Sequence, residues 1–366
     1  MKITKVEAFQ ILTPRYYQEH PVKGSEPPTG HVIIKLYVDD GLVGLGEAPD
    51  SMADDLGAIT KRYSELLIGR DATRITEINE LLRAQDFEST VGNAHLTAAI
   101  DLALYDLNGK MQGVPAHALM GGKVRESVYF CYPIIGEHLS EGVERNASYL
   151  QRLVDLGHHL FRFYISGDAE KDDRFLTEMK NRFGDKIRLK SIDLIGNFPD
   201  WETPLRYANV LRHHEPYNFE QPSNDMKVSA EFVKRMDVPV SMHIWNLEHG
   251  YEAIERGACT VLNLAWIWFG PTYVRRMFAL AEAAGFKTLL STDQDSTVGT
   301  AGAVHLGVSV PNLDLPSDPA GPLLYTASPA KERIRAEGSH LYPPEGPGLG
   351  IELDNDKMRE LTVASA

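Results

Sequence analysis

The sequence predicts an α/β protein in which a (β/α)8-type barrel is joined to a smaller α+β domain. Three features of the 366 residues lead to this prediction. Strand patterns fill the first 50 residues, helical periodicity follows to about residue 120, and short β-rich runs then alternate with helical stretches. This alternation is typical of a parallel sheet covered by helices, and eight β-rich runs fit a closed barrel better than an open sheet.

The first 50 residues have the pattern of antiparallel strands. The first strand opens at Ile3, the second is HVIIKLYV at 31–38, and Asp39-Asp40-Gly41 is a hairpin-type turn before LVGLGEA. Residues 13–30, between the first two strands, are too rich in Pro, Gly and polar residues for a strand or a helix. A loop of this length in a compact domain is usually functional or disordered.

Residues 51–120 are predicted to be helical. The strongest segment, NAHLTAAIDLALYDLNGKMQG, carries apolar residues at spacings of three and four, which predicts a helix with one apolar face. Gly113 and Pro115 then end this helix.

Eight β-rich runs follow, separated by helical patterns such as AEFVKRM and YVRRMFALAEAAG. The runs are SVYFCYPI (127–134), HLFRFYI (159–165), IRLKSID (187–193), YNFE (217–220), VPVSMH (238–243), TVLNLA (260–265), KTLLST (287–292) and NLDL (312–315). After Asp318 the alternation ends. The tail is rich in Pro and Gly, includes LGIELDNDKMREL, and is predicted to pack back onto the N-terminal domain.

Composition and charge narrow the classes of function. The formal net charge is −14 and the isoelectric point about 5.4, which disfavours nucleic acid and anionic membrane as partners but permits a small anionic substrate. The sequence has no apolar run of about 18 residues, which predicts no membrane span, and its start lacks a signal-peptide pattern. The two cysteines, Cys131 and Cys259, form no CxxC motif or disulfide framework, which favours a reducing, cytoplasmic location.

Three segments resemble one family along nearly the whole chain. DDGLVGLGEAP (39–49) and AAIDLALYDLNGKMQGVPAHALMGGKV (98–124) resemble the capping domain of the enolase superfamily, and VGTAGAVHLGVSVPNLDLPSD (298–318) resembles its seventh and eighth barrel strands. The subgroups of muconate lactonising enzyme and mandelate racemase are the most similar. The resemblance implies a modified (β/α)8 barrel of residues 126–319 and an α+β capping domain of residues 1–125, onto which residues 320–366 pack back.

The resemblance also implies a chemistry. Members of the superfamily abstract a proton α to a carboxylate and stabilise the resulting enolate on a divalent metal, usually Mg²⁺, and they are often homo-oligomers. Racemisation, epimerisation, β-elimination or cycloisomerisation is the outcome. Because an enolate concentrates negative charge, a metal and cations must face it, and a base must lie near the α-carbon. In a barrel these groups come from the ends of successive strands.

Asp193 and Glu220 match two metal ligands of the family. Asp193 ends the third barrel strand, and Glu220 ends the fourth in NFEQP. The third ligand of the family is acidic, whereas VPVSMH places His243 at that position. Imidazole suits Mn²⁺ or another transition metal better than Mg²⁺, so the predicted metal site is altered. The alternatives are ordinary polar strand-end residues, and for His243 a hydrogen-bonded histidine at an emptied site.

The bases of the family are altered more strongly. Where the second strand usually ends in Lys-x-Lys, this sequence has Arg162-Phe163-Tyr164, and Ala265 replaces a lysine of the sixth strand. Arg162 stays protonated and offers only charge and hydrogen bonds. Tyr164 is a candidate base if a cation such as Arg162 or a metal lowers its pKa, and otherwise packs or binds substrate. Alternation along the strand predicts that Arg162 and Tyr164 point into the barrel and Phe163 points outward.

Two carboxylates follow the seventh strand in STDQDS. Asp295 matches a glutamate of the family and is a candidate second acid or base, and Asp293 is a further candidate for contacting substrate. Two close carboxylates could share a proton, which would raise the pKa of one of them. A solvated loop pair is the alternative. The histidine found here in the racemase type is missing, so no His–Asp dyad is predicted.

The remaining candidates are expected to contact the substrate. Those within the loop 13–30, which resembles the mobile specificity loop of the family, are Arg15, Tyr16, Tyr17, His20 and Lys23. Trp245, Trp266 and Trp268 follow the fifth and sixth strands, where an aromatic wall would suit a ring-bearing or cationic ligand. The alternatives are an ordinary surface loop, and core packing for at least one tryptophan.

Two functions are therefore carried forward. The first is a metal-dependent lyase or isomerase acting on a small hydroxy or sugar acid, with Tyr164 as base and Arg162 stabilising the enolate. A dehydratase is favoured over a racemase, because a racemase needs two opposed bases and the sixth strand offers only Ala265. The second is a divergent relative that has lost the shared reaction and binds a small ligand or runs different chemistry, since function belongs to the site rather than the fold.

Overall fold

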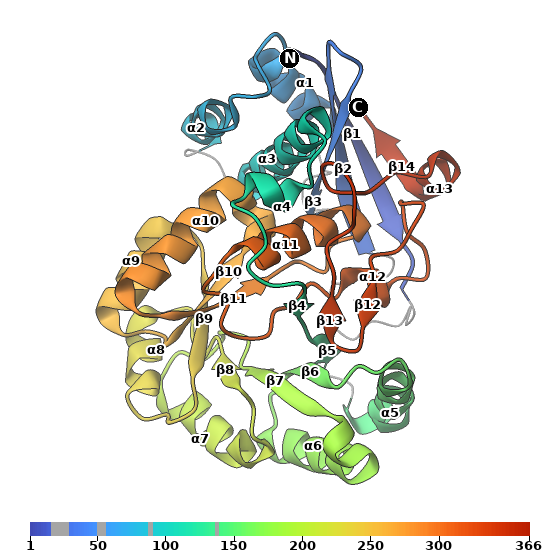
Figure 1. Cartoon of the computed structure of the whole chain (residues 1–366). Coiled ribbons are helices and arrows are strands. Elements are labelled where there is room, and N and C mark those ends of the chain that lie inside the picture. The colour runs from blue at the N-terminus through green and yellow to red at the C-terminus, as the bar shows by residue number, and fades with distance from the viewer. Residues whose placement is uncertain (16–28, 50–55, 87–90, 136–138) are drawn as a thin grey trace.

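The computed structural model describes residues 1–15, 29–49, 56–86, 91–135 and 139–366. A seven-stranded parallel sheet curls into a barrel with helices on its outside, and a four-stranded antiparallel sheet with its own helices lies at one end (Figure 1). The predicted modified barrel with an α+β cap is confirmed. No helix among the described residues combines the length and apolar composition that a membrane span requires.

The cap is built on an antiparallel sheet that unites both ends of the chain. Strands β1 (Ile3–Thr13), β2 (Thr29–Val38) and β3 (Val43–Pro49) form a meander, and β14 (Thr362–Ser365) pairs with the outer edge of β1. Helix α13 (Asn355–Leu361) leads into β14. The two termini therefore lie close together at the cap end in Figure 1. The division of the chain at residues 125 and 319 stays a prediction.

Four helices complete the cap and lead out of it. They are α1 (Leu56–Leu67), α2 (Ile75–Asp86), α3 (Val91–Gln112) and α4 (Ala116–Leu119). The expectation that α3 has one apolar face is wrong, because residues 96–109 are buried on every side, between β3 and the barrel helix α10 (Trp266–Ala284). Its polar residues are partnered instead of solvated: Asp101 accepts the Thr272 backbone N–H at 2.7 Å, and Asp106 accepts that of Leu45 at 2.8 Å.

The barrel alternates strands with helices in chain order. Its strands are β5 (Tyr132–Ile135), β6 (Leu160–Tyr164), β7 (Arg188–Asp193), β8 (Asn218–Glu220), β9 (Val240–Ile244), β10 (Val261–Ala265) and β11 (Lys287–Ser291). Besides α10, the helices are α5 (Leu139–Asp155), α6 (Ala169–Phe183), α7 (Glu202–Leu211), α8 (Met226–Val233), α9 (Leu247–Arg256) and α11 (Thr297–Ser309). The sheet order follows the chain from β5 to β11, so all strand ends meet at one mouth.

An irregular segment closes the barrel between β11 and β5. The Leu315 and Asp318 N–H groups bond to β11, and the Ser317 N–H donates to the Tyr129 carbonyl at 2.9 Å. The predicted strand at 312–315 is therefore displaced toward 314–318. Residues 298–309, expected within the seventh and eighth strands, form the buried helix α11 instead. Its small residues pack on all sides, so no helical periodicity marks it in the sequence.

A further, short sheet joins the segment before the first barrel strand to the C-terminal region. Strands β4 (Val128–Tyr129), β12 (Ala336–Glu337) and β13 (His340–Leu341) form a three-stranded sheet, and the short helix α12 (Gly321–Leu324) follows the closing segment. The C-terminal region thus passes over the barrel before it returns to the cap.

Gly46 lets strand β3 approach helix α3 more closely than any other residue would. A Cβ atom at Gly46 would lie 1.9 Å from the Ala99 carbonyl oxygen, which belongs to the helix backbone and cannot move aside. We predict that Gly46→Ala destabilises the protein by at least about 1–3 kcal/mol, the usual cost of overpacking. Gly57→Ala in α1 is the control, because its Cβ meets nothing within 4 Å. Thermal unfolding measures both, and equal melting temperatures for the two variants would contradict the prediction.

Candidate functional site

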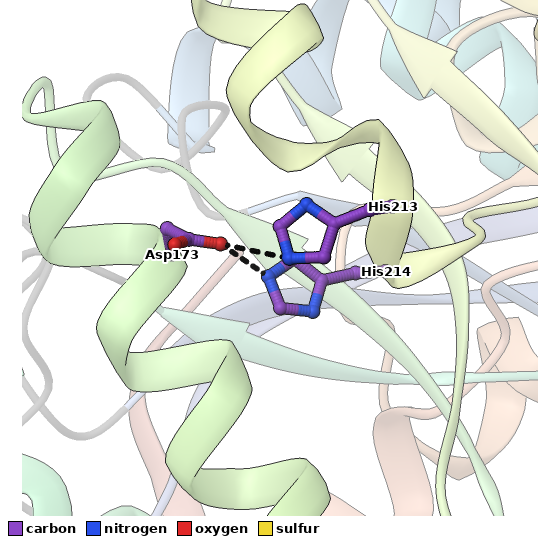
Figure 2. A group of neighbouring side chains, drawn as sticks. All are labelled: Asp173, His213 and His214. Carbon is purple, nitrogen blue, oxygen red and sulfur yellow. Dashed lines mark hydrogen bonds and ion pairs between the residues drawn. The ribbon is translucent and has the colours of Figure 1, made fainter.

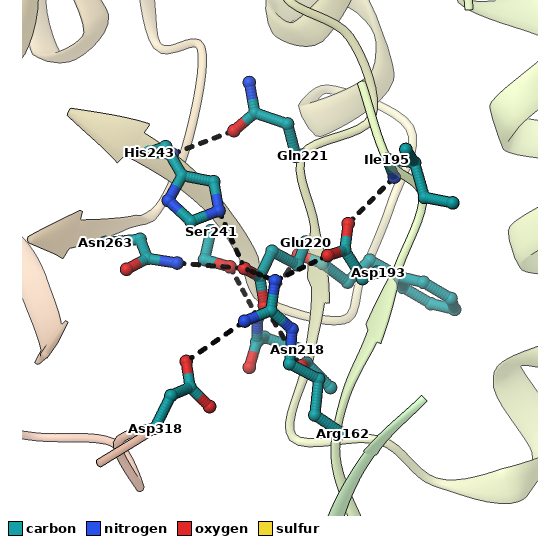
Figure 3. Close-up of polar contacts among 12 residues, drawn as sticks. Arg162, Asp193, Ile195, Asn218, Glu220, Gln221, Ser241, His243, Asn263 and Asp318 are labelled. Carbon is teal, nitrogen blue, oxygen red and sulfur yellow. Dashed lines mark hydrogen bonds and ion pairs between the residues drawn. The ribbon is translucent and has the colours of Figure 1, made fainter. Parts of the chain in front are cut away.

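Polar side chains from five segments converge at the barrel mouth (Figure 3). Arg162 comes from β6, Asp193 from β7, Glu220 from β8 and His243 from β9, and Asp318 comes from the closing segment. The strand register sets Tyr164 beside Asp193 and Asp193 beside Glu220, which brings the three strand ends level. Arg162, Asp193 and Glu220 are each less than 10% exposed.

Glu220 is the most heavily bonded group of the cluster. Its Oε1 lies 2.8 Å from Arg162 Nη2 and 3.1 Å from His243 Nε2. The same oxygen accepts a hydrogen bond from Asn263 at 3.0 Å. Its Oε2 accepts from Ser191 Oγ at 3.1 Å and lies 3.3 Å from the Lys190 ammonium. Burial alone would raise the pKa of Glu220, but Arg162 and Lys190 outweigh burial and hold this pKa well below its ordinary value.

Asp193 and Asp318 complete a chain of buried ion pairs. Asp193 Oδ2 accepts from Arg162 Nη2 at 2.5 Å, and Oδ1 accepts the Ile195 N–H at 2.8 Å. Asp318 Oδ2 lies 3.0 Å from Lys190 Nζ and 3.5 Å from Arg162 Nη1. Burial raises the pKa of Asp193 despite Arg162. Burial alone would lower the pKa of Lys190, but Asp318 and Glu220 raise it to about 12.

Backbone strain is concentrated beside these residues. Ile195, Gln221 and Gln294 adopt the left-handed conformation with φ of 64°, 48° and 59°, which is unfavourable for residues other than glycine. Each follows a strand end of the mouth by a few residues. The Gln221 side chain in turn accepts the His243 backbone N–H at 2.8 Å. The strand ends are thus held in a specific arrangement by their own loops.

Tyr164 lies at the mouth with the Arg162 guanidinium carbon 4.5 Å from the centre of its ring. Arg162 acts to lower the pKa of Tyr164, but the net lowering that a tyrosine base requires is not found. Burial raises this pKa well above its ordinary value, and Asp193 and Glu220 add to the increase, so the nearby guanidinium is outweighed. The phenol is therefore protonated at rest. The outward direction of Phe163 is confirmed, since its ring stacks against Phe175 of α6 at 5.8 Å.

A cavity of about 220 Å³ opens beside the cluster. It is lined by Arg162, Tyr164, His243, Trp245, Asp293 and Asp318, together with Cys131, Pro133, Trp268, Thr292, Gln294, Ala320 and Leu324. Asp193 and Glu220 do not line it, whereas their partners Arg162 and His243 do. The cavity is smaller than the roughly 300–1,000 Å³ of sites for drug-sized ligands, which favours a small molecule.

The tryptophans divide between the cavity and the core. Trp245 and Trp268 stack at 4.4 Å and both line the cavity. Trp266, predicted to bind substrate, is fully buried in the core cluster and donates its Nε1–H to Asp295 at 3.1 Å. Helix α10 begins at Trp266, so the residue directly after the strand turns inward while Trp268 faces the mouth.

Asp293 lines the cavity, whereas Asp295 does not. Asp295 is 2% exposed. It accepts one hydrogen bond from Trp266 Nε1 and another from the Asp293 backbone N–H, the latter at 3.1 Å. Burial raises the pKa of Asp295 well above its ordinary value, and Glu47 adds to the increase. Desolvation by the cavity walls also raises the pKa of Asp293, although its side chain is exposed to the cavity. Asp295 therefore supports the loop that carries Asp293.

Glu47 of the cap fixes the same loop from the other side. It is 1% exposed and accepts the N–H groups of Ser296 at 2.6 Å and of Gly299 at 2.7 Å, which are the free donors at the start of α11. His31 Nδ1 lies 3.1 Å from Glu47. Burial alone would raise the pKa of Glu47, but His31 and Ser296 lower it below its ordinary value.

The predicted specificity loop is described only at its ends. Arg15 donates to Thr29 Oγ1 at 2.8 Å, and its guanidinium lies 5.7 Å from the centre of the Tyr325 ring. Tyr325 donates a hydrogen bond to the Gln294 carbonyl at the mouth. Arg15 is thus connected to the cavity wall through Tyr325 and does not itself line the cavity. Tyr16, Tyr17, His20 and Lys23 lie outside the described residues, so their contact with substrate stays a prediction.

Comparisons with known proteins identify the relationship. The family described as "Mandelate racemase / muconate lactonizing enzyme, N-terminal domain" matches residues 13–121, and "Enolase C-terminal domain-like" matches residues 145–357. Muconate cycloisomerase 1 of Rhodococcus opacus is 30% identical over 348 residues, which cover 90% of each chain. The chain belongs to the mandelate racemase and muconate lactonizing enzyme family of the enolase superfamily.

Further family members align over nearly the whole chain. N-succinyl-L-Arg/Lys racemase of Bacillus cereus is 23% identical over 379 residues, which cover 99% of this chain and 98% of the racemase. The solved structure of muconate lactonizing enzyme from Pseudomonas fluorescens, complexed with muconolactone, matches with a TM-score of 0.88 at 24% identity, over 99% of each chain. Lyase and isomerase chemistry is therefore the chemistry of this family.

Members of the enolase superfamily depend on a divalent metal ion, usually Mg²⁺. The predicted ligands Asp193, Glu220 and His243 face one another here, but Arg162 Nη2 lies between the two carboxylates. In the part of the chain that the structure describes, these three do not bring three ligand atoms within 4.8 Å of one another. Their arrangement does not fit a divalent ion, and their role as metal ligands stays a prediction.

One group outside the mouth does bring three such ligands together (Figure 2). Within the described residues this group consists of Asp173 on α6 and the adjacent His213 and His214. Asp173 Oδ1 lies 3.1 Å from His213 Nε2 and 2.8 Å from His214 Nε2. The side chain of His213 is 58% exposed, so this is a surface group, with ligand types that suit zinc or other transition metals.

Several residues of the site were not singled out from the sequence. Lys190, Asn263, Asp318 and Glu47 all contribute buried partners. The available signal was a polar residue at a buried position: Lys190 and Asn263 interrupt apolar strands, and Asp318 ends the last recognisable barrel segment. Buried polar residues must be partnered, but the sequence does not show with what.

We predict that Glu47→Gln destabilises the protein by about 1–3 kcal/mol at pH 7, because buried N–H donors of α11 lose a charged acceptor. The folded-state pKa of Glu47 is lowered, so its ionisation stabilises the protein above the unfolded-state pKa. That contribution disappears as pH falls through the folded-state pKa. The gap in melting temperature between wild type and variant should therefore stay constant from pH 7 to about 5 and narrow below about 4.3.

The matched control is Glu80→Gln, which alters an exposed ion pair with Arg276 at 3.4 Å. Exposed pairs of this kind contribute about 0–1 kcal/mol, so this variant should unfold near the wild-type temperature. A Glu47→Gln protein as stable as the control at pH 7 would contradict the assigned role of Glu47.

Proposed function

We propose that this chain is a lyase or isomerase that removes a proton α to the carboxylate of a small hydroxy or sugar acid, with loss of water as the favoured outcome. The observation that carries the proposal is one small cavity lined by a cation, a protonated phenol and a carboxylate, Arg162, Tyr164 and Asp293. Abstraction next to a carboxylate needs a base, and departure of a hydroxyl needs an acid. The family relationship supports the reaction class.

The pKa directions support a division of labour between two of these groups. Tyr164 has a pKa raised well above its ordinary value, so it carries a proton that it can donate. Asp293 has a pKa raised from that of an ordinary aspartic acid, which makes its carboxylate a stronger base. We therefore propose that Asp293 takes the α-proton and that Tyr164 gives a proton to the leaving hydroxyl. This exchanges the roles expected from the sequence, where Tyr164 is the base.

Arg162 is proposed to face the developing enolate. Its guanidinium lines the cavity and keeps its charge at every relevant pH, since neighbouring carboxylates raise its pKa despite burial. A fixed cation aimed at developing charge stabilises a transition state because it needs no reorganisation. Dehydration is favoured over racemisation because Ala265 ends β10, where a second, opposed base would be needed.

Trp245 and Trp268 are proposed to form the wall against which the substrate packs. The centres of their stacked rings are 4.4 Å apart, and the centre of the His243 ring lies 6.1 Å from the centre of each. An aromatic wall beside a carboxylate-lined cavity also suits a substrate with a ring or a positively charged group. The acid is therefore to be identified by testing a panel of hydroxy acids, sugar acids and cyclic amino acids as substrates.

A second candidate function is ligand binding without the shared reaction. It is favoured by Ala265 at the lysine position and by the engagement of both Glu220 oxygens with protein partners. In this case the cavity would hold a small acid without exchanging its α-proton, and the panel would yield binding but no solvent deuterium incorporation.

The division of labour predicts different defects for two variants. Asp293→Asn should slow deuterium incorporation at the α-carbon in D₂O by about 10²–10⁴-fold, the usual contribution of a general base. Tyr164→Phe should retain that exchange while product formation falls by a similar factor, because only the proton for the leaving group is lost. Mass spectrometry of recovered substrate and product separates the two steps.

Tyr251→Phe is the matched control, since Tyr251 is 58% exposed and lies on α9 outside the cavity. If Tyr164→Phe loses exchange and Asp293→Asn keeps it, Tyr164 is the base as the sequence suggested. If both keep exchange and turnover, neither group carries the reaction.

A further inference from the structure

We propose that Arg162 is a built-in cation that takes the place of the divalent ion between Asp193 and Glu220, so that this barrel mouth receives its ligand without a metal. The inference goes beyond the proposed function, because it rests on side-chain contacts alone and holds whichever group moves the proton. It also reverses the expectation drawn from the sequence, in which Asp193, Glu220 and His243 hold a metal.

The first support is that the carboxylate of Glu220 has no capacity left for a metal. A carboxylate offers about four lone-pair sites. Glu220 already meets five donor groups, which are Arg162, His243 and Asn263 on Oε1 and Lys190 and Ser191 on Oε2. An incoming ion would have to displace several of these partners at once.

The second support is the position of the guanidinium. One nitrogen, Arg162 Nη2, lies 2.5 Å from Asp193 and 2.8 Å from Glu220. It therefore bridges the two carboxylates in the way a shared metal ion would (Figure 3). The third predicted ligand, His243, is turned to Glu220 through Nε2 rather than to an open position.

The third support is the balance of charge. Asp193, Glu220 and Asp318 carry three negative charges, and Arg162 and Lys190 carry two positive ones. Lys190 is 0% exposed and Arg162 is 8% exposed, so neither cation can turn into solvent without leaving buried carboxylates unpaired. A divalent ion would then be held beside two fixed cations, which disfavours its binding.

The remaining donors of Arg162 indicate what the built-in cation does. Its Nε is buried without a hydrogen-bond partner in the described part of the chain, and its Nη1 is 3.5 Å from Asp318, a long contact. Buried donors are nearly always paired in a folded protein. Arg162 lines the cavity, and the weakly paired Nη1 is the donor that a ligand could satisfy. We infer that Nη1 receives the carboxylate or oxyanion of a small acid.

Metal binding without substrate tests the proposal. Chelator-treated protein is titrated with Mn²⁺ by isothermal calorimetry and electron paramagnetic resonance, in a His213→Ala/His214→Ala background that removes the surface group of Figure 2. This protein should bind no Mn²⁺ at the mouth up to about 1 mM. Any dissociation constant would then be larger than those of most functional sites of this kind. Arg162→Ala should gain one Mn²⁺ site with a dissociation constant at least about tenfold below that limit, because Asp193 and Glu220 are freed.

Two further variants keep the result interpretable. Arg162→Lys retains the positive charge and should stay without metal. Arg162→Ala/His243→Asp supplies three carboxylates in place of a guanidinium and an imidazole, and its melting temperature should rise with added Mn²⁺ even if Arg162→Ala alone folds poorly. Asp193→Asn added to either alanine variant should remove the gained site.

Two outcomes would overturn the proposal. One is a Mn²⁺ site in the otherwise wild-type background that Asp193→Asn abolishes, since the carboxylates would then accept a metal with Arg162 present. The other is no gain of metal in either Arg162→Ala variant, since the guanidinium would then not occupy an ion position. Neither outcome depends on whether a substrate has been found, so the proposed function stands or falls separately.

Discussion

Arg162 reaches from β6 across the mouth to carboxylates on β7 and β8, and most of the buried polar network is arranged around this contact. Both carboxylates lie deep in the barrel, where an unpaired charge is strongly unfavourable. Removing one member of a buried pair typically costs about 3–5 kcal/mol, so Arg162 and its partners depend on one another. Lys190, Asn263 and Ser191 then occupy the remaining acceptor positions of Glu220.

The cap is tied to the barrel by the same kind of interaction. Asp101 of α3 and Glu47 of β3 are buried carboxylates of the cap, and each accepts backbone N–H groups from the barrel domain, Asp101 from Thr272 and Glu47 from Ser296. Such bonds are directional, so they fix how the cap sits over the mouth. Glu47 meets the start of α11, directly after the loop that carries Asp293, and so connects the cap to the cavity wall.

The sequence predicts the framework because strand positions depend on local patterns. Seven of the eight expected β-rich runs coincide with strands, and Asp193, Glu220 and His243 fall at or near strand ends as expected. Helix α11 is missed because its small residues are buried on every side and leave no periodic signal. Trp266 is misplaced because a helix starts at the strand end, which turns the first residue inward and the third toward the cavity.

Side-chain partners are harder to predict than strand ends. Whether Arg162 meets a substrate or two carboxylates depends on the length of its side chain and on the register of neighbouring strands, which no local pattern encodes. The pKa of Tyr164 is a similar case. The sequence correctly places a cation beside the phenol, but the pKa follows the sum of burial, one cation and several carboxylates, and burial dominates.

A guanidinium differs from a metal ion in a way that suits this mouth. Metal coordination collects ligands around one centre, whereas the planar fork of arginine separates its donors along two edges. In Arg162, Nη2 binds Asp193 and Glu220 behind the cavity, and Nη1 has only the long contact of 3.5 Å to Asp318. Since Arg162 lines the cavity and those two carboxylates do not, the charge they hold in place is presented to the ligand through the guanidinium alone. The strand-end carboxylates of this family are thus retained here as the anchor of a cation that belongs to the chain itself.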